Sequence, residues 1–166
     1  MPSFGDQAVL TIDLDALCAN WRRLGEQAPG AGCAAVGQGG AYGLRAGKVG
    51  PALWRAGCRR FFVAHSTEAL ALREALLQES MPATIHILHG PAPGAEDDLA
   101  QAGLSPALST PAQVEAWGKP ARRLGRQLPA ALHVDTGMNR LGLTTAETET
   151  LLSDNAALDG IELEFV

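Results

Sequence analysis

The chain has 166 residues, of which 46% are hydrophobic and 19% are charged, a composition typical of a single globular domain rather than a disordered chain. No apolar run approaches the ~20 residues that a membrane-spanning helix requires. With 13 basic and 18 acidic side chains, the net charge is −5, which gives no electrostatic reason to expect nucleic acid or a membrane surface as a partner.

The first predicted elements are a strand and a following helix, which together cover residues 8–28. Over residues 8–14 the side chains of Val9, Thr11 and Asp13 alternate with those of Leu10, Ile12 and Leu14. Such alternation is typical of a strand with one buried face. From about Asp15 apolar side chains recur every 3.6 residues, which predicts a helix that Pro29 and Gly30 end. The apolar stripe of this helix consists of Leu14, Leu17, Trp21 and Leu24.

Residues 33–166 repeat a unit of one short apolar run and one helical segment, at intervals of about 25 residues. Two helix starts are indicated by threonines: Thr110 precedes a proline, and Thr144 forms a capping box with Glu147. The runs begin near Cys33, Arg60, Thr84, Ser105, Ala131 and Gly160. One helical segment is marked by Ala69, Leu72, Ala75 and Leu76, a shorter helical segment by Val114 and Trp117, and the last by Leu151, Leu152 and Leu158.

Strands that alternate with helices at this spacing predict βαβ units, a parallel sheet and an α/β fold. A (β/α)8 barrel needs eight units and typically ~250 residues, whereas a doubly wound open sheet is complete with five or six strands. Because six units are present and the chain stops within the sixth strand, periodicity alone favours the open sheet. No linker divides the chain, so a single domain over residues 1–166 is expected.

The three cysteines, Cys18, Cys33 and Cys58, are odd in number and lack C-x-x-C spacing, so we expect neither a disulfide framework nor a structural zinc site. The N-terminus lacks the basic region and apolar run of a secretory signal. Both observations favour buried thiols in a cytoplasmic protein.

Two loops that contain glycines follow predicted strands. Residues 36–44 read V-G-Q-G-G-A-Y-G-L, and such glycines allow the backbone to approach an anion closely. The order matches neither a P-loop nor a dinucleotide-binding fingerprint, and a flexible strand-to-helix loop is the alternative. Residues 90–94 form a turn-rich loop that suits either ligand binding or simple chain reversal, of which we favour reversal.

A third loop, residues 133–142, concentrates polar groups directly after an apolar run. In a parallel α/β fold, the loops at the carboxyl ends of strands carry the functional site. Arg140 in this loop has the bidentate geometry that binds a carboxylate or a phosphate. The alternative is an ion pair between Asp135 and Arg140 that merely braces the loop.

Four collinear stretches resemble the N-terminal part of the alanine racemase family. They are residues 10–17, residues 41–43, residues 61–64 with Glu68, and above all residues 133–142, which carry the specific pattern D-T-G-M-x-R-x-G. The resemblance implies a barrel that binds pyridoxal 5'-phosphate (PLP), here an incomplete (β/α)8 barrel of about six units. One N-terminal strand precedes it, and the family's separate C-terminal β domain is absent. This expectation overrides the preference for an open sheet.

The family's site residues carry over only where this chain matches them. The resemblance places Tyr42 at the tyrosine that hydrogen-bonds the PLP phosphate. It places Arg140 at the arginine that reaches both the PLP phenolic oxygen and the substrate carboxylate, and Met138 at a backbone contributor to the carboxylate site. His133 stands where some members carry a modified lysine that supports the arginine.

One departure from the family concerns the residue that holds the cofactor. The family motif reads V-V-K-A-[DN]-A-Y-G, and its lysine forms the imine with PLP and is one of the two racemisation bases. The residue four positions before Tyr42 is Gln38. Because an amide neither forms an imine nor acts as a base near neutral pH, covalent capture of the cofactor and one proton transfer are expected to be lost. The family's other catalytic groups lie beyond Val166, so we expect Gln38→Lys alone not to restore racemisation.

The resemblance therefore implies an isomerase, which would interconvert L- and D-alanine through PLP for D-alanine and peptidoglycan precursor synthesis. As written, with Gln38 in place of the lysine, the chain is expected to be inactive. A non-catalytic PLP-binding or scaffold barrel is the alternative. The implied partners are a small amino acid and, as in the family, a second copy of the chain in a homodimer.

Overall fold

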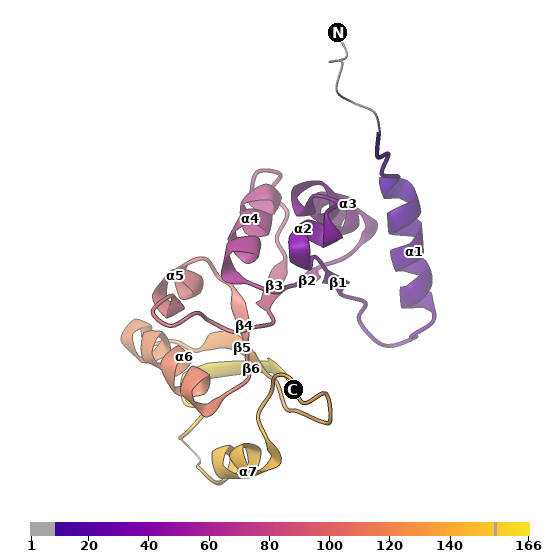
Figure 1. Cartoon of the computed structure of the whole chain (residues 1–166). Helices are drawn as coiled ribbons and strands as arrows, with labels where there is room; N and C mark the ends of the chain where they lie inside the picture. Colours follow the sequence, from indigo (N-terminus) through magenta and orange to yellow (C-terminus); the bar gives the residue numbers. More distant parts are fainter. Residues whose placement is uncertain (1–8, 155) are drawn as a thin grey trace.

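The computed structural model describes residues 9–154 and 156–166 of the chain, and strands alternate with helices along them (Figure 1). The helices are α1 (Leu14–Glu26), α2 (Gln38–Tyr42), α3 (Ala46–Ala56), α4 (Ser66–Leu77), α5 (Glu96–Gln101), α6 (Pro111–Leu124) and α7 (Thr145–Ser153). The strands are β1 (Ala35–Val36), β2 (Arg60–Val63), β3 (Thr84–Ile87), β4 (Ser105–Leu108), β5 (Leu128–Leu132) and β6 (Ile161–Phe165). The alternation expected from the spacing is thus confirmed.

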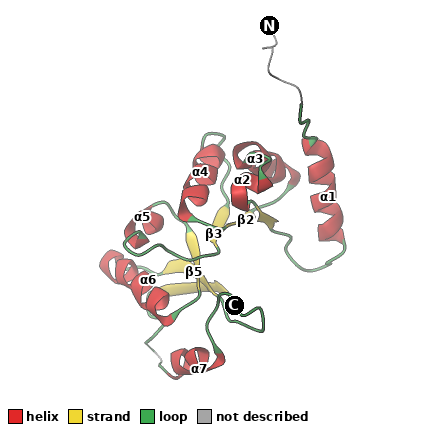
Figure 2. Ribbon diagram, in the orientation of Figure 1, coloured by secondary structure: helices red, strands yellow, loops and turns green. Residues whose placement is uncertain are grey.

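The six strands form one parallel sheet in the order β1-β2-β3-β4-β5-β6, which is the order of the chain. Figure 2 shows the strands side by side, with α3 to α7 arranged in an arc around them. A doubly wound sheet would reverse its strand order at a switch point and carry helices on both faces. The preference for an open sheet is therefore wrong, and the arrangement is the wall of an incomplete (β/α)8 barrel.

The strand expected over residues 8–14 is not seen in the described residues. Ala8 lies outside them, residues 9–13 have no regular secondary structure, and Leu14 is the first residue of α1. Val9 and Leu10 are 86% and 77% exposed. A strand needs a neighbouring backbone for its hydrogen bonds, and no described strand runs alongside this segment (Figure 1). The expectation is therefore corrected: an alternating pattern without a pairing partner stays irregular.

Alternate side chains along β2 and β3 point to opposite faces of the sheet and belong to two different packed layers. Phe61, Ile85 and Ile87 belong to the core cluster that also includes Leu72 of α4, while the intervening Phe62 and His86 point to the other face of the sheet. In a barrel this other face is the interior. Within the described residues no helix is both long enough and apolar enough to cross a membrane.

Helix caps agree with the sequence pattern better than helix lengths do. Thr110 Oγ1 accepts the Gln113 N–H at 3.2 Å, and Thr144 forms the expected capping box with Glu147. However, the helix that was expected to be shorter, α6, spans 14 residues. Its outer face is polar, with Lys119, Arg122 and Arg123, so its two apolar markers underestimate its extent. Leu158 lies outside α7, and β5 begins at Leu128, before the run expected near Ala131.

The expectation of buried thiols holds for two of the three cysteines. Cys18, Cys33 and Cys58 are free, with Cys18 and Cys58 buried and Cys33 partly buried. Burial raises the pKa of the Cys58 thiol, which keeps it protonated.

Candidate active site

Two of the candidate loops follow strands whose carboxyl ends lie at the same end of the sheet. One follows β1 and contains Gln38 and Tyr42, and the other follows β5 and contains Met138 and Arg140. Because all six strands are parallel, their carboxyl ends lie at one end of the barrel wall. The structure thus places the predicted site residues on one side, in two separate loops.

The loop after β1 is a left-handed helical turn rather than an irregular loop. Gly39, Gly40, Ala41 and Tyr42 have φ values of 61°, 63°, 59° and 55°. The Ala41 N–H donates to Gly37 O at 2.8 Å, and the Gly43 N–H donates to Gly39 O at 2.9 Å. Glycine adopts this conformation freely, but a residue with a Cβ is destabilised there by roughly 1–2 kcal/mol. Ala41 and Tyr42 are therefore strained and need support from neighbouring groups.

Gln38 and Tyr42 contact each other across this turn. The Gln38 amide Nε2 donates to the Tyr42 hydroxyl oxygen at 3.2 Å. Tyr42 is 65% exposed, and its O–H can still donate because the contact with Gln38 uses only its oxygen. Residue 38 thus carries an amide that binds the neighbouring phenol.

Glu68, at the start of α4, ties the turn to the next strand end. Its Oε1 accepts the Gly39 N–H at 2.6 Å, while Oε2 accepts the N–H groups of Ala64 and His65 at 2.9 and 3.1 Å. Burial raises the pKa of Glu68, but the N–H groups of His65, Gly39 and Ala64 outweigh burial and leave this pKa below its ordinary value. Sequence reasoning noted Glu68 only as part of a matching stretch. Its position three residues after the cap of α4 was the signal for its role.

The loop after β5 is held by Asp135 through backbone contacts. Asp135 Oδ1 accepts the N–H groups of Gly137 and Asn139 at 2.9 and 3.0 Å. The N–H groups of Asn139 and Gly137 lower the pKa of Asp135. Within the described residues no ion pair joins Asp135 to Arg140. The brace is therefore an Asp–backbone turn, and the alternative Asp135–Arg140 pair is wrong.

The base of this loop is closed by two backbone hydrogen bonds of Leu143, the residue after Gly142. The Leu143 N–H donates to His133 O at 2.7 Å, and the Asp135 N–H donates to Leu143 O at 2.9 Å. Gly142 has a φ of +117°, and a Cβ there would lie 2.6 Å from the Asp135 nitrogen. Only glycine suits this position.

The remaining predicted residues of this loop face outward. Arg140 is exposed, and Met138 is 67% exposed. Among the described residues no hydrogen bond joins His133 to Arg140, and His133 Nδ1 lies instead 3.4 Å from Ser109 Oγ. The loop thus presents a cation and a backbone segment that are available to a ligand.

A hollow of about 380 Å³ lies where β2 and β3 end. The rings of His65 and His89 stack there with centroids 4.6 Å apart, and His89 Nδ1 lies 3.0 Å from Ala64 O. The loop over residues 90–94 reverses the chain between β3 and α5 and also borders this hollow.

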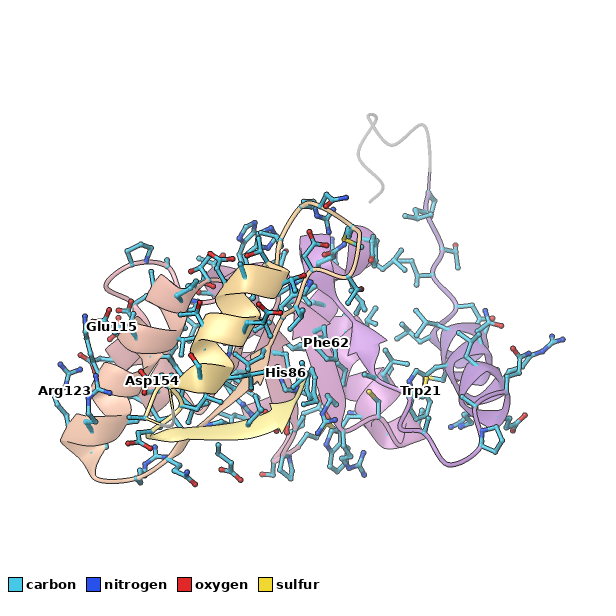
Figure 3. All side chains as sticks on the ribbon, turned by 90° about the horizontal axis from the view of Figure 1, so that it is seen from below. Trp21, Phe62, His86, Glu115, Arg123 and Asp154 are labelled. Atoms are coloured by element: carbon cyan, nitrogen blue, oxygen red, sulfur yellow. The ribbon has the colours of Figure 1, made fainter. Side chains whose placement is uncertain are left out.

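The barrel interior contains a polar cluster that sequence reasoning missed. His86 is fully buried, stacks on Phe62 at 4.7 Å and meets the edge of Phe165 at 4.9 Å (Figure 3). Its Nδ1 lies 3.8 Å from Glu164 Oε2, which accepts the Ser105 hydroxyl at 2.6 Å. Burial, with a smaller contribution from the Arg60 charge, lowers the pKa of His86 to about 4. His86 is therefore neutral at pH 7.

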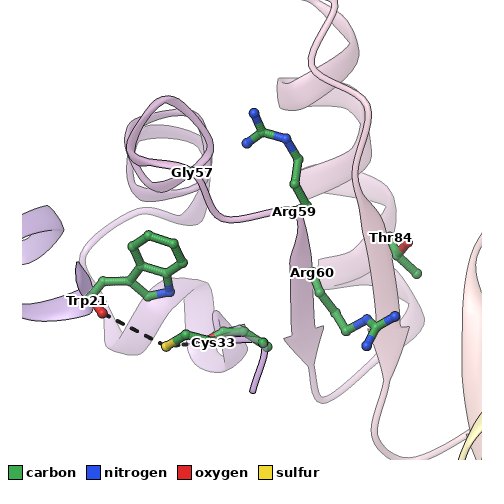
Figure 4. Close-up of a pocket in the computed structure, with 8 residues that line it drawn as sticks. Trp21, Cys33, Gly57, Arg59, Arg60 and Thr84 are labelled. Carbon is green, nitrogen blue, oxygen red and sulfur yellow. Dashed lines mark hydrogen bonds between the residues drawn. The ribbon is translucent and has the colours of Figure 1, made fainter. Parts of the chain in front are cut away.

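Another hollow, of about 330 Å³, lies at the opposite end of the strands (Figure 4). It is bordered by Trp21 and by Arg60 and Thr84, the first residues of β2 and β3. The neighbouring Arg59 donates to two backbone carbonyl oxygens and lies 4.0 Å over the Trp54 ring. In barrels this end contributes to stability rather than chemistry, so we place the candidate site at the carboxyl ends.

Comparison with known proteins gives consistent matches. The family described as "Alanine racemase, N-terminal domain" matches residues 12–166. An alanine racemase of Methylobacterium nodulans is 52% identical over 147 residues, covering 89% of this chain and 39% of the relative. A catabolic alanine racemase of Agrobacterium fabrum is 47% identical over 162 residues, covering 98% of this chain and 41% of the relative.

Solved structures agree with these matches. The alanine racemase of Bartonella henselae with covalently bound pyridoxal phosphate has a TM-score of 0.86 and 37% identity, covering 92% of this chain and 44% of that one. The alanine racemase of Streptomyces coelicolor has a TM-score of 0.80 and 35% identity, covering 90% and 39%. The chain thus spans about two fifths of the length of the curated relatives that it matches.

Proposed function

This chain belongs to the alanine racemase family, and we propose that it is the cofactor-barrel part of such an isomerase, in which Gln38 has removed the covalent attachment of PLP. The reaction class is the interconversion of L- and D-alanine, and PLP, when bound, supplies the electron sink for that reaction. Alanine as substrate, a homodimer and a cytoplasmic location complete the proposal. As written, the chain does not racemise alanine.

The residues present fit a pyridoxal phosphate only in part. The exposed Tyr42 hydroxyl can donate to a phosphate, and Arg140 lies in a loop at the same end of the sheet. Gln38, however, offers an amide that already donates to Tyr42, and an amide cannot form an imine. Covalent attachment therefore does not fit this site, and we derive no catalytic step through the cofactor.

The observation that carries the proposal is the place of Gln38. It opens the left-handed turn after β1, four residues before Tyr42, where the family has its lysine. The physiological role of the reaction, D-alanine synthesis or alanine catabolism, is also part of the proposal. Relatives named simply alanine racemase and relatives named catabolic both match this chain, and we assign the isomerase from which it derives, rather than the Gln38 chain itself, to D-alanine supply for peptidoglycan precursors.

A second candidate function follows from the Gln38–Tyr42 contact. A barrel that keeps the phosphate-binding tyrosine but lacks the lysine would bind PLP without covalent capture, as a non-catalytic binding or scaffold protein. The free O–H of Tyr42 favours this candidate over complete loss of ligand binding.

The test is to incubate the chain with PLP, reduce with borohydride, and locate any pyridoxyl group by peptide mass spectrometry. The chain has two lysines, Lys48 and Lys119, which report non-specific labelling. We expect no label between residues 36 and 44 in the wild type, and a label at residue 38 in Gln38→Lys. Racemisation of alanine by the wild type would overturn the proposal. Retention of PLP by the unreduced wild type in equilibrium dialysis would favour the second candidate.

A further inference from the structure

Glu68 divides its carboxylate between two tasks. Oε2 accepts the N–H groups of Ala64 and His65 and so caps the start of α4, at 2.9 and 3.1 Å. Oε1 instead reaches a different loop and accepts the Gly39 N–H at 2.6 Å, across 29 positions of sequence. The first task stabilises a helix, whereas the second joins the turn after β1 to the turn after β2.

Glu147 shows that the cap alone needs only one oxygen. In the capping box of α7, Glu147 Oε2 accepts both the N–H and the hydroxyl of Thr144 at 2.8 Å. Its role is therefore confined to its own helix. The contact from Glu68 Oε1 to Gly39 is an addition that helix capping does not explain.

The Gly39 N–H controls where residue 38 points. A peptide unit is planar, so the N–H of Gly39 and the C=O of Gln38 belong to one rigid plane. A hydrogen bond that holds this plane restricts the backbone of residue 38 and hence the direction of its side chain. The same bond secures the first residue of a turn that includes the strained Ala41 and Tyr42.

We infer that Glu68 is a positioning residue of the candidate site, whose Oε1 holds the Gly39 N–H and thereby orients residue 38 and Tyr42. The inference rests on the proposed function, since those two positions matter through the cofactor. A hydrogen bond from a backbone N–H to a carboxylate is among the stronger bonds in proteins, so one oxygen is enough for the task. The carboxylate has no lysine or arginine partner among the described ion pairs, and it is compensated by three N–H groups instead.

The diagnostic variant is Glu68→Gln. A carboxylate accepts at both oxygens, whereas the glutamine amide accepts at one and presents donor hydrogens at the other. The variant can therefore satisfy the cap or the turn, not both. Because the cap offers two N–H donors and the turn offers one, we expect the cap to be kept and the Gly39 contact to be lost. The matched control is Glu147→Gln, which weakens a capping box that has no described hydrogen bond to the turn after β1.

The first readout is backbone amide hydrogen exchange in the full chain, measured by NMR. We expect exchange at Gly39 to be about tenfold faster in Glu68→Gln than in the wild type and unchanged in Glu147→Gln. Glu68→Ala, which removes both oxygens, should accelerate exchange at Ala64 and His65 as well. Exchange at Gly39 within about twofold of the wild type in both Glu68 variants would overturn the inference, as would equal acceleration by Glu147→Gln.

The second readout is cofactor capture at residue 38 in a Gln38→Lys background. In the Gln38→Lys chain, we expect borohydride to trap a pyridoxyl group at residue 38. This group should form about tenfold more slowly when Glu68→Gln is also present, and at an unchanged rate when Glu147→Gln is also present. Equal rates in the two double variants would refute the positioning role. If Gln38→Lys itself traps no pyridoxyl, the proposed function fails, whereas the exchange at Gly39 still decides the role of Glu68.

Discussion

Lowering the pH from 7 to 5 should destabilise this protein through a single buried histidine. His86 is 0% exposed, and within the described residues neither of its ring nitrogens has a hydrogen-bond partner. It lies between the rings of Phe62 and Phe165, with Glu164 and the Arg60 charge as the ionisable groups facing it. Burial therefore lowers the pKa of His86 from its ordinary 6.5 to about 4.

The sign of the effect follows from proton binding. Between pH 6.5 and pH 4 the unfolded chain binds a proton at His86 while the folded chain does not, so acid favours unfolding. The stability is fully present above pH 6.5 and is lost as the pH falls toward 4. One pKa unit corresponds to about 1.4 kcal/mol, so the loss between pH 7 and pH 5 is about 2 kcal/mol.

The assay is urea unfolding at pH 7 and pH 5, followed by the fluorescence of tryptophan, since Trp117 is fully buried. Glu68, Asp135 and Glu147 also have lowered pKa values, but their ordinary values of 4.5, 3.8 and 4.5 place their effect mainly below pH 5. His86→Leu should remove about 2 kcal/mol of the pH dependence, because leucine cannot bind a proton. Equal losses in the free energy of unfolding between the two pH values, in wild type and in His86→Leu, would refute this role of His86.

Three further predictions concern stability. Gly142→Ala should lower the free energy of unfolding by about 1–3 kcal/mol, because its Cβ would meet backbone atoms at a positive φ, whereas Gly32→Ala, with open space, should be nearly neutral in the same melt. Thr110→Ala removes the cap of α6 and should cost about 1 kcal/mol in urea unfolding, and no change would contradict the observed cap. Leu72→Ala, at 1% exposure, should cost about 2–5 kcal/mol, and a comparable loss in Leu70→Ala, at 44% exposure, would contradict the burial argument.

Local patterns in the sequence were enough to predict that strands and helices alternate over residues 33–166. The period of the apolar residues located the strands and helices of residues 33–166, and threonines marked two helix starts, because both signals depend on residues within one or two turns of each other. The motif in residues 133–142 and the tyrosine at 42 identified the two loops of the candidate site. The structure then placed both loops at the same end of a parallel sheet.

Tertiary structure decided what local patterns leave open. Strand order distinguished a barrel wall from a doubly wound sheet, although both have the same β/α spacing. The pattern at residues 9–13 alternates like a strand, yet it stays irregular because pairing requires a second backbone beside it. The contacts of Glu68 with Gly39 and of Ser105 with Glu164 join positions 29 and 59 residues apart. Such contacts depend on how the elements pack. Packing joins residues that lie too far apart in the sequence for any local periodicity to predict their contact.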